Sequence, residues 1–239
     1  MKIISWNCSG GFRKKFKRLF QYNADVYIVQ ECENFETIDP EILKELKTGI
    51  GNFFWKGENK NKGLAVLGRK GIKLESLNWN ENFRGRNLKY FLPVLVEGKY
   101  KLLGVWAHKA EAKAFAYIGQ FWQYMENNKD QFNDIVIGGD FNSNSIWDSW
   151  DRWWNHTDCI NELEKLNIFS VYHKIVNEEQ GEESRKTFFH RKNRDTSYHI
   201  DYFLASGKWI CEKTSFSIGR TEEWLDISDH MPLILELPM

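Results

Sequence analysis

The 239-residue chain is 42% apolar and 28% charged, which is the balance of a globular protein with enough apolar material for a sizeable core. Its 33 basic and 33 acidic side chains give a net charge of about zero, so the chain lacks the overall basic charge that favours non-specific binding to nucleic acid. If the chain binds nucleic acid, a local basic patch or a bound metal would have to supply the positive charge that contacts the phosphates.

The first half of the chain alternates short apolar runs with helical patterns. Residues 13–23 place Phe16, Leu19 and Phe20 at helical spacing, and residues 39–49 begin with Asp39 as the expected N-cap. Only a short turn separates the runs 90–98 and 100–109, which predicts a hairpin. We expect helices at 13–23 and 39–49, and strands at 2–7, 25–31, 63–69, 90–98 and 100–109.

The second half continues this alternation. We expect helices at 112–128 and 159–168, and strands at 134–142, 187–191, 199–206 and 231–238. Helices interleaved with strands indicate an α/β (α+β) fold. Because antiparallel hairpins must coexist with crossover connections, the sheets should be mixed.

Targeting and boundary signals are missing from the sequence. No run approaches the ~20 apolar residues of a membrane span, and the start "MKIISWNCSGG" lacks the apolar region of a signal peptide.

The cysteines are far apart and have no zinc-like spacing, so we expect free, mostly buried thiols. No linker divides the chain. We therefore expect a single domain over 1–239 in the cytoplasm, without a membrane anchor.

Polar side chains that suit metal and phosphate chemistry stand at the ends of several predicted strands. Ligand sites of open α/β sheets collect at strand ends, and carboxylate and carbonyl oxygens suit Mg²⁺, Ca²⁺ or Mn²⁺ better than zinc. The residues are Asn7, Glu31, His108, Asp140, Asn142, Asp201, Asp229 and His230.

Each of these residues also has a purely structural interpretation, as a turn former, a solvated strand end or a satisfied histidine. Asp201 is the exception, because it lies within an apolar run and a buried lone carboxylate needs a partner. Asp140 and Asn142 are two residues apart, so on an extended strand they would face the same way. Such a pair is stronger evidence for a site than either residue alone.

Six short segments carry these residues, in the order "SWNCSG", "VYIVQEC", "GVWAHK", "GGDFNSN", "YHIDYFLAS" and "SDHMPL", and they span nearly the whole chain. In this set the chain resembles the endonuclease/exonuclease/phosphatase superfamily, which includes deoxyribonuclease I, exonuclease III-type abasic-site endonucleases, sphingomyelinases and inositol polyphosphate phosphatases. The resemblance implies a deoxyribonuclease I-like, four-layer sandwich: two mixed, mainly antiparallel β-sheets flanked by helices, with the site at one edge.

The resemblance also implies metal-assisted hydrolysis of a phosphate ester, with Mg²⁺ (or Mn²⁺) as the cofactor. Glu31 would be the main metal ligand, with Asn7 and Asp229 close to the metal or its waters. Asp140 would orient or deprotonate the attacking water. Asn142 would bind a phosphate oxygen or fix Asp140.

The remaining site residues take their roles from the same resemblance. His230 would stabilise the phosphorane-like transition state, with Asp201 on its other ring nitrogen. His108 would contact the phosphate or protonate the leaving oxygen. The abasic-site branch of the family carries tyrosine at this strand end, so His108 favours the other branches.

Four tryptophans follow the Asp-Asn motif, at positions 147, 150, 153 and 154. They are typical either of a platform for base stacking beside the cleft or of a loop packed by its own aromatic rings. Trp147, His156, His199 and Arg86 are candidates for substrate binding; for the two histidines a structural or surface role is the alternative. The basic segments 83–90 and 184–194 would supply a local phosphate-facing patch or form solvated loops.

The sequence therefore predicts a metal-dependent phosphodiesterase or nuclease that acts on nucleic acid, as a monomer and with no protein partner indicated. The alternative is the same chemistry on a small or lipid phosphate ester of the phosphoinositide or sphingomyelin type. A non-catalytic binding module is disfavoured, because such a protein should have lost acidic residues that this chain retains.

Overall fold

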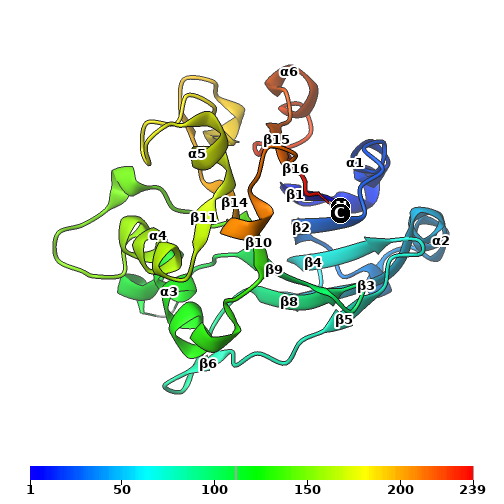
Figure 1. Ribbon diagram of the computed structural model, residues 1–239. Helices are drawn as coiled ribbons and strands as arrows, with labels where there is room; N and C mark the ends of the chain where they lie inside the picture. Colours follow the sequence, from blue (N-terminus) through cyan, green and yellow to red (C-terminus); the bar gives the residue numbers. More distant parts are fainter. Residues whose placement is uncertain (111, 239) are drawn as a thin grey trace.

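The apolar runs form two six-stranded β-sheets that pack face to face, as the computed structural model shows for residues 1–110 and 112–238 (Figure 1). The first sheet has the strand order β15 (Ser215–Ile218), β16 (Leu233–Glu236), β1 (Lys2–Asn7), β2 (Val26–Cys32), β4 (Lys62–Arg69), β3 (Ile50–Asn59). The second has the order β11 (Ile168–Ser170), β14 (Asp201–Ser206), β10 (Ile135–Asp140), β9 (Tyr100–Trp106), β8 (Phe91–Val96), β5 (Leu74–Ser76).

Both sheets are mixed. The pairs β1–β2 and β9–β10 are parallel, while their other neighbours pair antiparallel. The predicted hairpin over 90–109 is confirmed by β8 and β9, which pair with Val96 opposite Tyr100. Two short ribbons lie outside the sheets: β6 (Asn82–Phe83) with β7 (Arg86–Asn87), and β12 (Phe188–Phe189) with β13 (Ser197–Tyr198).

Helices cover the outer face of each sheet. Figure 1 shows α1 and α2 beside the first sheet and α3 and α4 beside the second. The helices are α1 (Phe16–Phe20), α2 (Pro40–Gly49), α3 (Ile118–Asn127), α4 (His156–Lys165), α5 (Val171–Val176) and α6 (Thr221–Trp224). In the part of the chain that the structure describes, no helix has the length and apolar character needed to cross a membrane.

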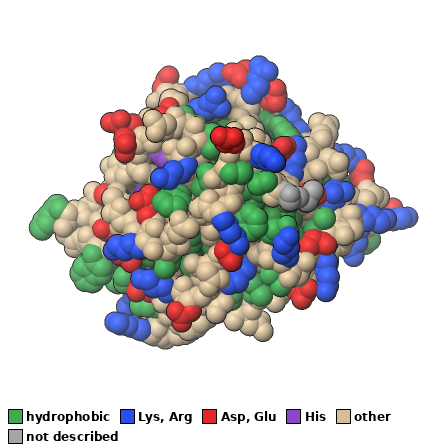
Figure 2. All heavy atoms as spheres, viewed as in Figure 1, with side chains coloured by type: hydrophobic (Ala, Val, Ile, Leu, Met, Phe, Trp, Pro, Cys, Tyr) green, Lys and Arg blue, Asp and Glu red, His purple; other side chains and the backbone are tan. Residues whose placement is uncertain are grey.

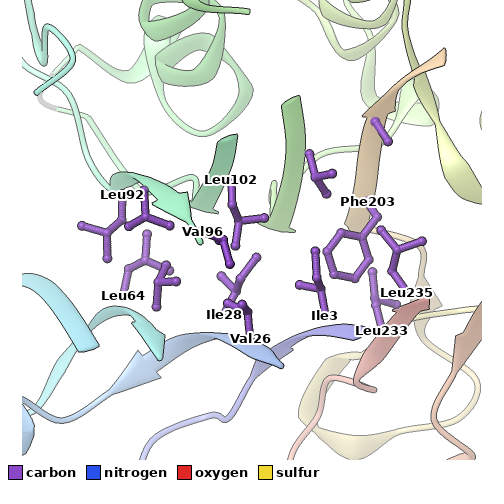
Figure 3. Close-up of a cluster of buried hydrophobic side chains, with 14 of the residues drawn as sticks. Ile3, Val26, Ile28, Leu64, Leu92, Val96, Leu102, Phe203, Leu233 and Leu235 are labelled. Atoms are coloured by element: carbon purple, nitrogen blue, oxygen red, sulfur yellow. The ribbon is translucent and has the colours of Figure 1, made fainter. Parts of the chain in front are cut away.

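Three apolar layers hold this sandwich together, because side chains alternate across each strand. Ile3 of β1 points into the layer between the sheets, whereas Ile4 points to the helices on the outside. Figure 3 shows the middle layer, where Ile28 and Leu64 of the first sheet meet Leu102 of the second. The four-layer architecture expected from the resemblance is therefore confirmed.

Two glycines bring β10 close to its neighbours. A Cβ atom on Gly139 would lie 1.9 Å from the carbonyl oxygen of Val105 on β9, and one on Gly138 would lie 2.4 Å from the Phe203 ring. Neither position has room for a side chain. The glycines thus allow the strand that ends in Asp140 to pack against its neighbouring strand and the ring of Phe203.

Some predicted boundaries are wrong. The helix expected over 13–23 is a 3₁₀ turn, Phe12–Lys14, followed by the five-residue α1, and α3 begins at Ile118 and not at residue 112. The strand expected over 187–191 covers only Phe188–Phe189, and the helix expected over 159–168 runs from His156 to Lys165. By contrast, α2 begins after Asp39, whose carboxylate caps the amides of Glu41 and Ile42 as expected.

Candidate active site

Strand ends from both sheets converge at one edge of the sandwich. Asn7 ends β1, Asp140 ends β10, and Asp201 begins β14 directly opposite Asp140 in the antiparallel register. His230 lies just before β16, and its carbonyl accepts a hydrogen bond from the Trp6 indole at 3.0 Å. All four polar side chains are buried: Asn7, Asp140, Asp201 and His230.

The Asp140 carboxylate accepts three hydrogen bonds. The Asn7 amide donates to Oδ2 at 2.9 Å, the Asn142 side chain donates to Oδ2 at 3.1 Å, and the Asn142 backbone N–H donates to Oδ1 at 2.8 Å. Asn142 also donates to the carbonyl of Ala107 at 3.1 Å. The side chains of Asp140 and Asn142 do lie together, but the prediction that they face the same way on an extended strand is wrong. Asn142 has a left-handed φ of 47°, so the chain turns there and does not continue as an extended strand.

The partner that Asp201 requires is His230. The imidazole Nδ1 lies 3.0 Å from Oδ2 and 3.2 Å from Oδ1 of the Asp201 carboxylate. Within the residues that the structure describes, no hydrogen bond involves Nε2 of this ring. The pair therefore leaves Nε2 as the ring atom available to a ligand.

Burial and charge shift the pKa values of this cluster. Burial raises the pKa of Asp140, the nearby Asp201 carboxylate raises it further, and together they bring it to about 7. Burial alone would lower the pKa of His230, but the carboxylates of Asp201, Asp140 and Asp229 outweigh burial and raise this pKa to about 9. The imidazole is thus charged at neutral pH, beside a carboxyl group that can exchange a proton there.

Glu31 is aimed at this edge by a β-bulge. The register of β2 with β4 shifts between Gln30 and Cys32, and Glu31 has a φ of 59°. Its neighbour Gln30 pairs with Asn7 across the parallel strands, so Glu31 follows directly beyond the Asn7 position. The carboxylate forms an ion pair with Lys62 at 2.6 Å. Asp229, next to His230 in the chain, is half-buried.

His108 lies two residues beyond the end of β9. Its ring packs against Trp106 at 4.8 Å between ring centres, and the neighbouring Ala107 N–H donates to the Asp140 carbonyl at 2.9 Å. Burial, together with Lys89 and Lys109, lowers the pKa of His108. This imidazole is therefore mainly neutral at pH 7, in contrast to His230.

The buried trio Asp140, Asp201 and His230 is also a candidate metal centre, because one potential ligand atom of each lies within 4.8 Å of the others. However, Nδ1 of His230 already faces Asp201, and both Asp140 oxygens already accept hydrogen bonds. A metal at this trio would have to replace that hydrogen-bond network.

No protein-family model matches the chain, and no curated protein matches it in sequence. Solved structures do match over its whole length. A 3′-5′ exonuclease from Neisseria meningitidis superimposes with a TM-score of 0.73 at 18% identity, covering 100% of both chains. An AP endonuclease from Archaeoglobus fulgidus gives a TM-score of 0.70 at 16% identity, again covering 100% of both chains.

The chain therefore shares the fold of these two solved structures. A humanized TDP2 from D. rerio is a further match, with a TM-score of 0.67 at 19% identity over 100% of this chain and 99% of that one. In this fold the polar strand ends lie at one edge of the sandwich, as the resemblance implied. At such low identity the comparison establishes the fold, and the roles of individual residues depend on the geometry above.

The four candidate substrate-binding residues lie outside the buried cluster. Trp147 lines a pocket beside Asn142, with 48% of its surface exposed. Arg86 is exposed, with its guanidinium 5.3 Å from the centre of the Phe115 ring. His156 bonds Ser143 and Gln180, and His199 bonds the Arg185 carbonyl; both histidines are buried, which favours the structural alternative for them.

The tryptophan loop divides into packed and exposed rings. Trp154 stacks on Phe115 at 4.5 Å and donates to the Ala114 carbonyl, whereas Trp150 is 98% exposed and Trp153 is 66% exposed. Figure 2 shows hydrophobic side chains protruding at the left edge of the view, over the loop that leads to α4. Trp153 also contacts the Trp154 ring edge-on, at 4.8 Å between ring centres, so the idea of a loop packed by its own aromatic rings holds for Trp154 and in part for Trp153, but not for Trp150.

Sequence reasoning missed the residues that hold the site in place. The Thr187 hydroxyl accepts the backbone N–H groups of Ile200 and Asp201, at 3.0 and 3.1 Å. The Ser228 hydroxyl donates to the Asn7 carbonyl at 2.7 Å and accepts the His230 N–H at 3.0 Å. Small hydroxyl residues in loops carry no pattern that identifies such contacts, although Ser228 precedes the Asp-His pair.

Proposed function

We propose that the protein is a metal-dependent hydrolase that cleaves phosphodiester bonds in nucleic acid. The observation that carries this is the buried cluster in which a charged His230–Asp201 pair lies beside an Asp140 whose pKa is raised to about 7. Structures with the same fold support the substrate class: one is a Neisseria 3′ phosphatase bound to a product DNA hairpin, another a D. rerio TDP2 with a single-stranded DNA product.

His230 is proposed to bind the scissile phosphate through Nε2. Because Asp201 holds Nδ1 and favours the imidazolium, the ring presents a positive N–H to the phosphate oxygens. That charge becomes more favourable as negative charge develops in the phosphorane-like transition state. Asp201 acts as a positioning residue, since it fixes both the ring orientation and its charge.

Asp140 is proposed to orient the attacking water and accept its proton. A general base works best when its pKa lies near the operating pH, and burial beside Asp201 brings Asp140 to about 7. Asn7 and Asn142 hold the carboxylate in one orientation by donating to it from two strand ends. His108 is proposed to contact the phosphate or to protonate the leaving oxygen.

Glu31, Asn7 and Asp229 are proposed to hold Mg²⁺ or Mn²⁺. The donor set fits, because it consists of carboxylate and amide oxygens and because Glu31 follows the residue that pairs with Asn7 at the end of β1. The Lys62 ammonium pairs with this carboxylate at 2.6 Å, and a metal ion bound there would take its place. A bound divalent cation would neutralise phosphate charge and lower the pKa of a coordinated water.

The same chemistry on a small or lipid phosphate ester is the second candidate. His108 favours it, because the resemblance places histidine at this strand end in sphingomyelinases and inositol phosphatases as well as in deoxyribonuclease I. Nucleic-acid and lipid substrates share the phosphate ester that is hydrolysed and differ in the groups attached to it. Turnover on a panel of substrates distinguishes them.

We also propose that residues 1–239 work as one domain and as a monomer in the cytoplasm. The layer between the sheets draws side chains from β1, near the start of the chain, and from β16, near its end, which supports a single domain. Cys8, Cys32 and Cys159 are buried and Cys211 is exposed, a pattern compatible with a reducing compartment.

The decisive experiment compares the wild type with Asp140→Asn and His230→Ala. Single- and double-stranded DNA, RNA, an abasic-site duplex, a phosphoinositide and a generic phosphodiester are each incubated with Mg²⁺, Mn²⁺ or a chelator. We expect turnover of nucleic acid that requires the metal and falls by roughly 10²- to 10⁴-fold in both variants, because each removes a group that acts on the reacting atoms.

Asp134→Asn is the matched control, since Asp134 is exposed at the opposite end of the same strand from Asp140. It should keep wild-type activity. No turnover on any substrate would contradict the proposed function, and equal turnover by the wild type and both site variants would contradict the residue roles. A preference for the phosphoinositide would establish the second candidate.

A further inference from the structure

A pocket of ≈ 710 Å³ opens directly beside Asn142, between residues 109–110 and 113–118 on one side and the loop 142–156 on the other. Its volume falls in the range of about 300–1,000 Å³ that is usual for small-molecule sites. Asn142 belongs to both places, because it lines the pocket and donates to the Asp140 carboxylate at 3.1 Å. A ligand in this pocket would therefore be adjacent to the reacting phosphate.

The walls of the pocket are tied together. The Trp154 ring, from the loop, stacks on Phe115 at 4.5 Å, and its indole N–H donates to the Ala114 carbonyl at 2.6 Å. The loop is also fixed at the start of α4, where Asp148 accepts the N–H groups of His156 and Thr157. These contacts connect the two sides of the pocket before a ligand arrives.

The charge in the pocket favours an anion. Three cationic side chains line it, Lys109, Lys113 and Arg152. The one acid that the structure shows in the lining, Asp148, is already bonded through both carboxylate oxygens to helix N–H groups. The Arg152 Nε atom lies 3.3 Å from a carboxylate oxygen of Asp151. Because this ion pair is exposed to solvent, water and salt weaken it and leave the guanidinium available to a ligand.

An aromatic surface completes the pocket. Trp147 lines it and is 48% exposed, with its ring 4.9 Å from Tyr198. Tyr198 stacks with Phe188 at 6.5 Å, and Phe188 lies 4.6 Å from the His230 ring. A continuous row of rings thus leads from the His230 imidazole to Trp147.

We propose that this pocket binds an unpaired nucleotide of the substrate strand next to the hydrolysed phosphate, with its base on Trp147 and its phosphate among Lys109, Lys113 and Arg152. The inference rests on the proposed function and specifies its substrate: strands with at least one unpaired nucleotide at the cleaved position. A nucleotide within a continuous duplex has both faces of its base covered by neighbours, so it cannot offer a face to Trp147.

The same loop offers a separate surface for the competing occupant, a lipid membrane. Trp150 is 98% exposed and does not line the pocket, so it is the ring that a bilayer would meet first. Binding of a nucleotide depends instead on Trp147 and on the cations around it. Trp150→Ala is therefore the matched control for Trp147→Ala, with the same chemical change in the same loop.

Binding is measured without turnover, in the Asp140→Asn protein with chelator, by fluorescence anisotropy of a labelled single-stranded DNA of about 12 nucleotides. Trp147→Ala should raise the Kd by about 5- to 150-fold, as expected for the loss of one base stack, and Trp147→Phe should recover most of this loss. Trp150→Ala should leave the Kd unchanged. Lys113→Gln should reduce the slope of log Kd against log salt by about 0.7.

A blunt duplex of the same length should bind at least tenfold more weakly than the single strand. Equal losses in Trp147→Ala and Trp150→Ala, or equal binding of the blunt duplex, would overturn the proposal. So would Trp150-dependent binding to vesicles of phosphatidylcholine and phosphatidylserine without binding of DNA. This binding test needs no hydrolysis, so the two proposals can fail separately. If the protein is inactive on every substrate but still binds DNA through Trp147, the proposed function is refuted and the nucleotide-binding pocket is supported.

Discussion

The three charged groups of the site determine one another's ionisation. Asp140 and Asp201 are both buried and lie opposite each other across β10 and β14, so two full negative charges there would repel strongly. The imidazolium of His230 relieves this repulsion through its bond to Asp201. Protons are therefore bound more tightly in the folded protein than in the unfolded chain, and stability should depend on pH.

We expect the free energy of unfolding, measured in chelator, to fall as pH rises from 6.5 to 9.5. The folded pKa of His230, about 9, exceeds its ordinary value of 6.5, so its contribution is complete below 6.5 and is lost as pH passes 9. The raised pKa of Asp140, about 7, acts in the same direction at lower pH. The His230 contribution is at most roughly 3 kcal/mol.

Urea denaturation of the wild type and of His230→Gln at several pH values checks this. The variant should show a flatter dependence between pH 7 and 9.5, because the group that titrates there is gone. Parallel curves for the two proteins would mean that His230 is not charged in the folded state.

At the scale of elements, the buried carboxylate of Glu183 links three segments of the chain, at Asn144, His173 and Gly181. Glu183 accepts from the Asn144 side chain at 3.0 Å and from the Gly181 N–H at 3.0 Å, and it lies 3.2 Å from Nε2 of His173. Asn144 also donates to the His199 carbonyl, just before β14. Burial alone would raise the pKa of Glu183, but these hydrogen bonds lower it to about 2.

Glu183→Gln should therefore destabilise the fold by roughly 3 kcal/mol at pH 7, since it leaves buried donors without their charged acceptor. The lowered pKa means that this contribution is present above about 4.5 and is lost as pH falls toward 2. Chemical denaturation at pH 7 and pH 3 measures the difference. Glu182→Gln, an exposed neighbour, is the control and should change little.

Periodicity predicted most of the long elements but not their beginnings. Residues 112–117 have the composition of a helix, yet α3 begins at Ile118, because Tyr117 adopts a φ of 57° and its N–H bonds the His108 carbonyl. A tertiary contact there overrides local preference. The bulge that aims Glu31 likewise depends on the pairing of β2 with β4, which no local pattern contains.

At the scale of the whole molecule, the four-layer fold followed from the resemblance and not from periodicity alone. The short apolar run of β1 is consistent with burial on both faces, but it does not say which strands meet across the sandwich. An acid inside an apolar strand indicated that Asp201 needs a partner, and the resemblance implied that this partner is His230. The pocket at Trp147 could not be predicted from the sequence, because its walls come from segments some 30 residues apart that only the fold brings together.

At the proposed metal site, Asn7 lies on β1 and Glu31 on β2 of the first sheet, and Asp229 lies just before β16 of the same sheet. A ligand that binds only the folded protein stabilises it, by about 2.7 kcal/mol at a concentration of 100 Kd. Mg²⁺ should therefore raise the Tm of the wild type.

Glu31→Gln should abolish this rise in Tm, whereas His230→Gln should keep it, because His230 is proposed to bind phosphate and not metal. Glu36→Gln, which removes an exposed carboxylate after the same strand, should behave as the wild type. Thermal unfolding with increasing Mg²⁺ distinguishes the two candidate centres directly. If the trio Asp140, Asp201 and His230 held the ion instead, the pattern would reverse: His230→Gln would lose the stabilisation, and Glu31→Gln would retain it.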